Sequence, residues 1–383
     1  MKSIQDWNQV FPKRATKARE AAGLPLSEAA SLLGFKNYQT LSGIEKGTRK
    51  ITAHELSAMA DVYGRTLGYF FEPEVLPDPK PLWRKVPDVN INQIERRFLA
   101  FLENYSSLEN LLGLTRRWKD IQKNYTKADF LERKFQLANQ LGCDIRNSLD
   151  LGARPASNLL NALENHLRVR ILHLPLPDGV SGASVVDDTL GVGILINLNE
   201  APWRRNFDLG HELFHIVTWG VFSHKEVGDG TKKTKPEQYA DAFASSLLLP
   251  KEPLLNSLKE ITIGGQIKLV DIIELAKEFG VSTEAILWRL VNLGQIHRSE
   301  VRKTLDNPEL SRVDRVMRRG LFFAGKPSTF PERYIFLACR SLLEGKISRG
   351  TFAKYLEIDR SDVDHTLREQ GFLEETYEEI APA

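Results

Sequence analysis

Cysteine is almost missing from this sequence. Only Cys143 and Cys339 occur among 383 residues, and they lie far apart in the chain. A scaffold held by several disulfides and a zinc site built from several cysteines are therefore both excluded. Such sparing use of cysteine is typical of proteins in a reducing compartment, so we expect a cytoplasmic location.

Long apolar runs and a large net charge are also lacking. No stretch of about 18 apolar residues occurs, so we expect no membrane span, and residues 1–8 lack the apolar core of a secretory signal. Lysine and arginine number 52 against 50 aspartates and glutamates, so nucleic-acid binding would need a local basic patch. The length of 383 residues, 42% of them hydrophobic, predicts two or three domains with sizeable cores.

Prolines mark the first division of the chain. Five of the 18 prolines fall within residues 73–90, where fixed φ angles and missing amide protons exclude a regular helix or a central strand. We expect a linker there, between an N-terminal domain at 1–72 and a helical connecting region at 91–145. Apolar residues at helical spacing after Ile94 support that helical region.

The texture of the sequence changes after the connecting region. Alternating and β-branched residues at 168–200, separated by turn-forming residues, predict a small sheet inside a core domain at 146–255. The remaining residues, 256–383, have mostly helical patterns. The predicted fold class is therefore mainly α with a small β-sheet (α+β).

The N-terminal domain has the pattern of a DNA reader. Short helices are expected at 14–22, at 27–33 and at 38–46, with glycines at their ends. Residues 1–72 contain 10 Lys/Arg against 7 Asp/Glu, a local excess of +3. Arg49 and Lys50 would contact phosphates, and the residues expected to face the bases at the third helix are Tyr38, Gln39, Thr40 and Ser42.

Three segments of this domain resemble the Cro/C1-type helix-turn-helix family, namely residues 18–24, 32–35 and 41–49. One extra residue between Gly34 and Glu45 departs from the commonest form of that family. The resemblance implies binding to double-stranded DNA, and by analogy a homodimer on two half-sites. The alternative is a helix-turn-helix used for dimerisation or partner binding alone.

The segment His211-Glu212-Leu213-Phe214-His215 is the most specific signal in the chain. Histidines at i and i+4 lie one turn apart on the same helix face, so both imidazoles can bind one ion. Glu212 stands beside them and is suited to take a proton from a water held by the ion. Flanking apolar residues predict a buried helix, against the alternative of two ordinary surface histidines.

A catalytic zinc needs a third protein ligand, and Glu237 is the candidate. It begins a second amphipathic helix and lies on nearly the same side as the buried stripe that starts at Ala240. Alternatively, Thr234 and Glu237 form a capping box that only closes the helix. Asp241 either bonds a ligand histidine or is a solvated position. His224 and Tyr239 could stabilise an oxyanion, but ordinary structural roles are favoured for both.

Residues 204–215 together with 237–244 are similar to the ImmA/IrrE metallopeptidase family. The resemblance implies a zincin-like core in which His211, His215 and Glu237 hold the metal and Glu212 is the base. Zinc is the expected ion, although two imidazoles and a carboxylate also suit manganese. Members of this family cleave helix-turn-helix repressors in stress or mobile-element responses, so the resemblance also implies a protein substrate.

The C-terminal region adds helices without a chemical signature. Residues 269–296 look like a second helix-turn-helix-shaped unit, which we interpret as a packing unit. A solvated helix face, or alternatively an electrostatic contact with DNA or a partner, is expected for four arginines: Arg312, Arg315, Arg318 and Arg319.

Taken together, the sequence predicts a DNA-binding regulator that carries a zinc-dependent endopeptidase, acting on a repressor-type partner or on itself. The alternative is a non-proteolytic regulator or antitoxin-like factor whose peptidase-like domain senses a ligand or a metal.

Overall fold

A computed structural model describes residues 4–65, 67–71, 80–83, 91–114, 125–227, 233–262, 267–319 and 327–372. The described part is predominantly helical with one small sheet, so the predicted fold class is confirmed. None of its helices combines the length and the apolar character needed to cross a bilayer.

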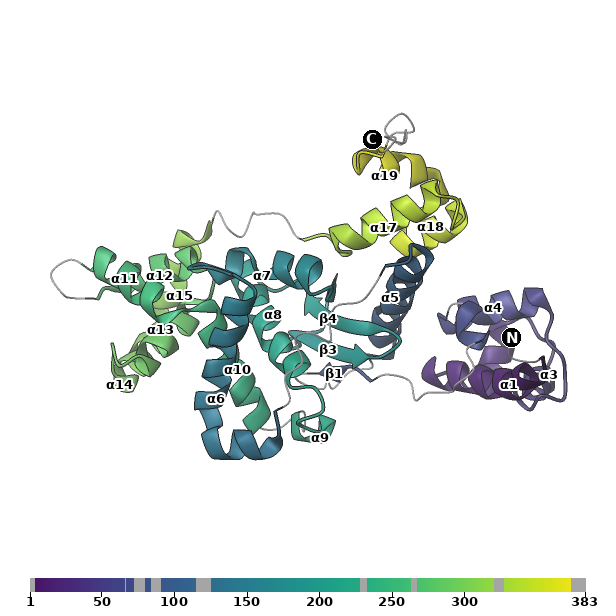
Figure 1. Ribbon diagram of the computed structural model, residues 1–383, viewed down its shortest axis with the longest axis horizontal. Coiled ribbons are helices and arrows are strands. Elements are labelled where there is room, and N and C mark those ends of the chain that lie inside the picture. Colours follow the sequence, from purple (N-terminus) through teal and green to yellow (C-terminus); the bar gives the residue numbers. More distant parts are fainter. Residues whose placement is uncertain are drawn as a thin grey trace, which may run out of the picture.

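The N-terminal bundle consists of helices of different lengths (Figure 1), and the first of them begins at Ile4, earlier than the start at residue 14 that the sequence predicts. In the third helix the Asn37 side chain accepts a hydrogen bond from the Thr40 amide, and Leu41 and Ile44 are fully buried. A capping box from Thr52 starts the fourth. The helices are α1 (Ile4–Ala21), α2 (Leu26–Leu32), α3 (Tyr38–Glu45) and α4 (Ala53–Tyr63), and a 3-10 turn, η1 (Leu67–Phe71), follows.

The described strands form one mixed sheet in the order β1-β3-β4-β2. Three of them fall within the predicted range 168–200, where β3 pairs antiparallel with β4 and β4 pairs parallel with β2. The fourth, β1, comes from the proline-rich segment that the sequence predicts as a linker, and it pairs antiparallel with β3. An edge position tolerates neighbouring prolines, which a central strand would not. The strands are β1 (Leu82–Trp83), β2 (Arg170–Leu174), β3 (Gly182–Asp187) and β4 (Gly191–Asn197).

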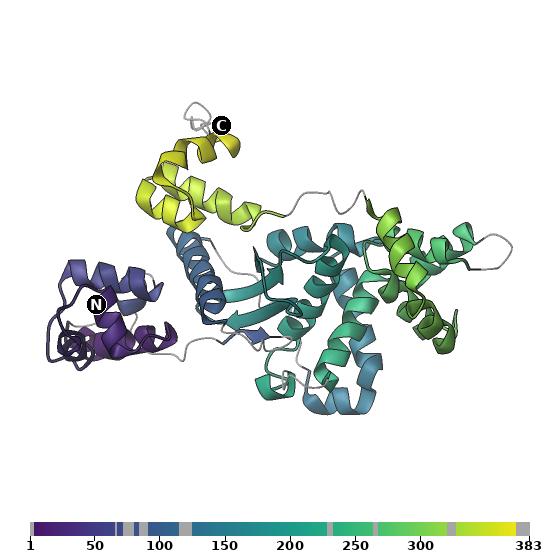
Figure 2. The ribbon, with the colours of Figure 1, turned by 180° about the vertical axis from the view of Figure 1, so that it is seen from behind.

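The two faces of the sheet carry different helices (Figures 1 and 2). Ile194 and Ile196 point to one face, where they pack with α8 (Pro202–Val217), α10 (Lys235–Leu248) and α6 (Lys127–Ser148). Leu195 points to the other face and packs with α5 (Asn92–Leu111) and α17 (Glu332–Leu343). Because successive side chains of β4 point to opposite faces, this one strand contributes to two separate hydrophobic cores.

Helix α10 is packed closely between α6 and α8, and small residues allow it. A Cβ added at Gly142 of α6 would lie 2.6 Å from the Phe243 carbonyl oxygen. A Cβ added at Gly210 of α8 would lie 3.3 Å from the Ala244 Cβ. The helix that contains Ala240 and Ala244 is thus closely packed on both of its sides.

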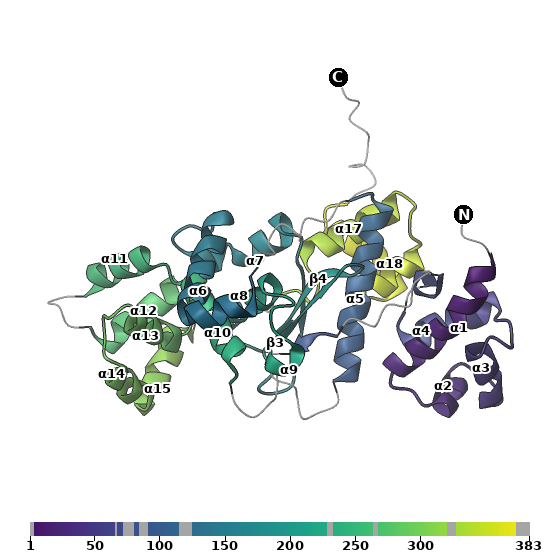
Figure 3. The ribbon, with the colours of Figure 1, turned by 60° about the horizontal axis from the view of Figure 1, so that its bottom comes forward.

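Helices α7 and α9 pack on the core beside α8 and α10, and the other helices form two groups, α11 to α15 and α17 to α19. In Figure 3, α17 and α18 lie beside α5. One member of the predicted arginine face is buried: Arg318 is 1% exposed, donates to Asp314 and to the Val281 carbonyl, and stacks over Trp203. The prediction of a solvated position is wrong for this residue. The bounds are α7 (Leu159–Asn161), α9 (His224–Val227), α11 (Lys251–Ile261), α12 (Leu269–Glu278), α13 (Thr283–Asn292), α14 (Arg298–Leu305), α15 (Pro308–Met317), α18 (Arg349–Leu356) and α19 (Val363–Glu369).

Candidate metal centre

Helix α8 carries the two histidines into the core. Pro202 stands at its first turn, where a missing amide proton costs nothing, and every residue from Asp208 to Val217 is buried. His211 and His215 are 0% and 3% exposed. Burying an imidazole costs free energy unless its nitrogen atoms have polar partners, so partners are expected around both histidines.

Helix α10 supplies the partner carboxylate from its first turn. The Thr234 hydroxyl oxygen accepts a hydrogen bond from the Glu237 amide, so Thr234 caps the helix. The Glu237 side chain, 4% exposed, instead turns toward the histidines of α8. The Thr234 hydroxyl therefore caps the helix, and the Glu237 carboxylate faces the histidines instead of completing the capping box of the alternative prediction.

Three side chains converge on one point. Glu237 Oε2 lies 3.1 Å from His211 Nε2, and Glu237 Oε1 lies 3.1 Å from His215 Nε2. The two Nε2 atoms are 3.3 Å apart. Donor atoms that sit about 2.0–2.1 Å from a tetrahedral zinc ion are roughly 3.3 Å from each other. The donor set and its spacing thus fit a divalent cation, and these residues form a possible metal site.

A second carboxylate holds the far side of His211. Asp241 Oδ1 lies 3.0 Å from His211 Nδ1, and Lys233 makes an ion pair with the other oxygen of Asp241. Burial opposes ionisation of Asp241, but the hydrogen bond and charge of His211, with Lys233, lower its pKa to about 2. A proton on Nδ1 shared with Asp241 leaves Nε2 of His211 as the metal-facing atom.

Glu237 is also held as a carboxylate. Burial raises its pKa, yet attraction and hydrogen bonds from His211 and His215 outweigh burial and lower the pKa well below its usual range. An ionised carboxylate with two imidazoles is the form that binds a divalent metal.

Glu212 lies between the histidines in sequence and faces the sheet. It is 1% exposed, and a Cβ added at Gly182, the first residue of β3, would lie 3.5 Å from Glu212 Oε1. The start of β3 therefore forms one wall beside this carboxylate. The sequence contains no signal that ties this glycine to Glu212.

Tyr239 and His224, the two oxyanion candidates, are not joined to this cluster by any contact among the described residues. Tyr239 is buried and its hydroxyl donates to the Phe130 carbonyl of α6, 3.3 Å away. His224 begins α9, but its side chain lies outside the described residues. Neither prediction of an oxyanion role gains support from a described contact.

The side chains proposed to read DNA occupy one outward region of the N-terminal bundle. Tyr38, Gln39, Arg49 and Lys50 are exposed, and Thr40 and Ser42 are half-buried. Arg49 donates to Glu55 at 2.8 Å and lies over the Phe35 ring, so part of its orientation is fixed before any ligand arrives.

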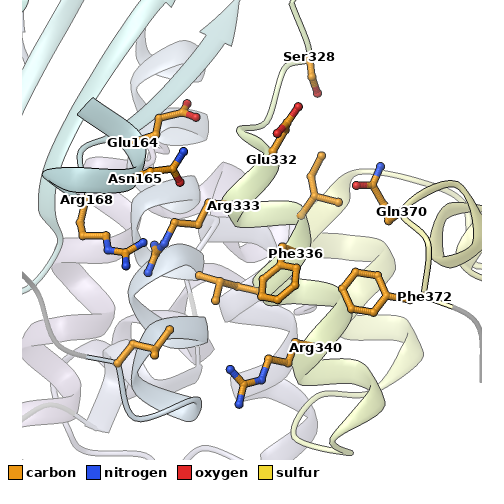
Figure 4. Close-up of a pocket in the computed structure, with 13 residues that line it drawn as sticks. Glu164, Asn165, Arg168, Ser328, Glu332, Arg333, Phe336, Arg340, Gln370 and Phe372 are labelled. Carbon is orange, nitrogen blue, oxygen red and sulfur yellow. The ribbon is translucent and has the colours of Figure 1, made fainter. Parts of the chain in front are cut away.

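Two cavities differ in their relation to the cluster. The smaller, about 420 Å³, has His215 in its wall together with Leu82, Trp219 and Phe222. The larger, about 850 Å³, contains none of the three candidate ligands and lies between the segment before β2 and α17 (Figure 4). Of these two cavities, the smaller is therefore the one beside the possible metal site.

The larger cavity has a mixed lining. Phe336 and Phe372 meet there with ring centroids 5.5 Å apart, near the Arg340 side chain. On the opposite wall, burial and the nearby charge of Glu332 raise the pKa of Glu164 to about 7.

Comparison with known families agrees with this geometry. Residues 164–291 match the model of a peptidase family described as the IrrE N-terminal-like domain, a range that contains all three candidate ligands. Residues 16–70 match a helix-turn-helix family, a range that contains α2 and α3. No curated protein matches the chain. Both family resemblances inferred from the sequence are confirmed: the chain carries a Cro/C1-type helix-turn-helix domain at its N-terminus and, after it, an IrrE N-terminal-like metallopeptidase domain.

Proposed function

We propose that this protein is a DNA-binding regulator whose metallopeptidase domain cleaves a protein substrate, either a helix-turn-helix repressor or its own chain. The observation that carries the proposal is the convergence of two imidazole nitrogens and a carboxylate within 3.1–3.3 Å of one another, in a buried setting. An ordinary surface histidine pair would have neither the burial nor the third donor.

Each residue of the cluster has a distinct task in this proposal. His211, His215 and Glu237 hold zinc or manganese, and Asp241 fixes the ring of His211. When bound, the cation supplies Lewis-acid chemistry, which polarises a peptide carbonyl and makes water more acidic. Glu212 accepts a proton from the attacking water and passes it to the leaving amine.

The test is fragment mapping by mass spectrometry. The full chain is incubated with zinc or manganese, alone and with the product of the adjacent gene. Glu212→Gln is expected to retain the metal and to slow cleavage by about 10²–10⁴-fold, the usual contribution of a general base. Glu260→Gln, at an exposed position of α11, is the matched control and should cleave normally. Full activity in Glu212→Gln would refute the mechanism.

DNA binding by the N-terminal domain is the second part of the proposal. Arg49 and Lys50 would contact phosphates, while Gln39 and the other outward residues of α3 would face the bases. Replacing Arg49 or Lys50 by alanine should lower the slope of log affinity against log salt by about one unit each. Lys303→Ala, in exposed α14, should leave the slope unchanged. If none of the three substitutions changes the slope, the proposed phosphate contacts of Arg49 and Lys50 are contradicted.

A non-proteolytic sensor is the competing function, and the larger cavity favours it. Its volume of about 850 Å³ and its aromatic and charged lining suit a small molecule. If the protein binds metal and DNA but leaves its own chain and neighbouring proteins intact under every inducing condition, the sensor should replace the peptidase. By analogy with other helix-turn-helix proteins, we also propose a homodimer that binds two half-sites.

A further inference from the structure

Strand β1 occupies the sheet edge nearest to the metal cluster. Leu82 stands opposite Ser184 and Trp83 opposite Ala183 in an antiparallel pair. Gly182, the next residue of β3 toward its start, lies against Glu212. A segment paired with β3 therefore runs beside the catalytic carboxylate.

Both side chains of β1 are fixed, one on each face of the sheet. Leu82 is 7% exposed and lies in the wall of the cavity of about 420 Å³ that also includes His215. Trp83 is 5% exposed on the α5 side, where its indole N–H donates to Glu95 Oε1 at 2.6 Å. The strand thus presents the Leu82 side chain to the face of the sheet that carries the histidine cluster, and the Trp83 side chain holds the strand on the opposite face.

An extended peptide commonly binds a sheet edge in this way. Main-chain hydrogen bonds to the edge strand supply affinity, and alternate side chains enter pockets on the two faces. A peptide that is to pass Glu212 and the histidines needs the main-chain groups of β3. Those groups face the position that β1 already fills at Ala183 and Ser184.

We infer that β1 is an internal competitor that stands in the position of the substrate backbone. The inference rests on the proposed peptidase function and refines it. The substrate is an extended peptide segment that pairs with β3 and puts a large aliphatic side chain where Leu82 now lies, beside His215, Trp219 and Phe222. Release of β1 is then a condition for substrate binding.

The test measures peptide binding rather than turnover. The probe is a fluorescein-labelled peptide that copies residues 78–87 of this chain, added to zinc-loaded full-length protein carrying Glu212→Gln. Fluorescence anisotropy gives its dissociation constant. Adding Leu82→Ala weakens the internal strand and is expected to tighten peptide binding about tenfold, because the competent fraction of sites rises. Leu176→Ala, a leucine equally buried in the adjoining core, is the matched control and should change nothing.

A second variant makes the opposite prediction. Cysteines at positions 82 and 184 would face each other directly across the antiparallel pair, a separation that a disulfide can span. Oxidation of Leu82→Cys/Ser184→Cys should abolish peptide binding, and reduction should restore it. A probe in which aspartate replaces the leucine should not bind.

The outcomes separate this inference from the proposed function. Equal affinity for the labelled peptide in the Leu82→Ala, Leu176→Ala and disulfide-locked proteins contradicts the inference that β1 competes with the substrate. Unchanged cleavage by the locked protein with Glu212 intact also overturns it, while leaving the peptidase standing. If binding follows the predicted order but no protein is ever cut, the peptidase fails and the binding position of the peptide stands.

Discussion

Two groups of buried charged side chains lie on opposite faces of the same sheet. On the α5 face, Glu109 accepts from Arg170 at 2.6 Å and from Arg333 at 2.5 Å, and all three are nearly inaccessible. On the α8 face, Glu237 meets two imidazoles at 3.1 Å. Both groups consist of a carboxylate between two nitrogen donors, yet their electrostatics differ.

The difference is in the permanence of the positive charge. Arginine stays protonated at every relevant pH, so Glu109 has lasting counter-charges from β2 and α17. An imidazole, in contrast, can lose its proton near neutral pH, and a neutral imidazole nitrogen is a ligand for metal ions. The first group is complete without any ligand and acts structurally, whereas the second is suited to a divalent cation.

Removing the central carboxylate of the structural group should have the largest effect. Glu109→Ala leaves the buried guanidinium of Arg170, 1% exposed, without its counter-charge. The free energy of unfolding, measured by urea denaturation, should fall by about 3–5 kcal/mol. Glu274→Ala, which removes an exposed partner of Lys277, is the control. A loss of unfolding free energy no larger than that of the control would contradict the structural role of Glu109.

The equivalent change on the metal face should act through the cation. At a zinc concentration about 100 times its dissociation constant, the wild-type protein should gain about 2.7 kcal/mol of unfolding free energy over the chelator-treated protein. Glu237→Gln should lose most of this gain. The measurement is denaturation with zinc and with chelator, and an undiminished zinc effect would remove Glu237 from the ligand set.

Asp241 should tune the metal without holding it. Asp241→Asn weakens the bond to His211 Nδ1 and should reduce zinc affinity by about 10–100-fold, as such supporting carboxylates do elsewhere. Competition with a chromophoric chelator measures the change. Asp306→Asn, exposed after α14, should bind zinc as the wild type does.

His173 of β2 is buried on the face of the sheet that packs against α8, and it offers a smaller test. Burial and the charge of Arg205 lower its pKa to about 4, so folding favours the neutral ring. Its contribution is fully present above the unfolded pKa of about 6.5 and is lost as the pH falls toward 4. Between pH 6.5 and pH 5 the loss is about 1.5 kcal/mol. His173→Gln should lack this component, and identical pH profiles of unfolding for the two proteins would contradict it.

Local features of the fold and site were predictable from sequence. The spacing of His211 and His215 is a property of one helical turn, and the buried stripe after Glu237 is likewise local. The caps at Asn37 and Thr234 also depend on neighbouring residues only. The pairing of Glu237 with the histidines needed the additional information of a family resemblance.

Features formed between distant segments were not predictable. Strand β1 has two residues, too few for any periodicity, and its partner β3 lies about 100 positions later. Burial of Arg318 depends on contacts with Trp203 and Val281, which no local pattern connects. The same is true of Glu109, whose two arginines come from β2 and α17.

The close packing of α10 has a consequence for the tolerance of the metal site. The hydrogen atoms of Gly142 and Gly210 set how near α6 and α8 come to this helix. A methyl group at either glycine would have to push α10 aside by a few tenths of an ångström or more, and Glu237 moves with it. The distance between Glu237 and the histidines of α8 therefore depends on residues that carry no functional group, through the spacing of neighbouring helix backbones.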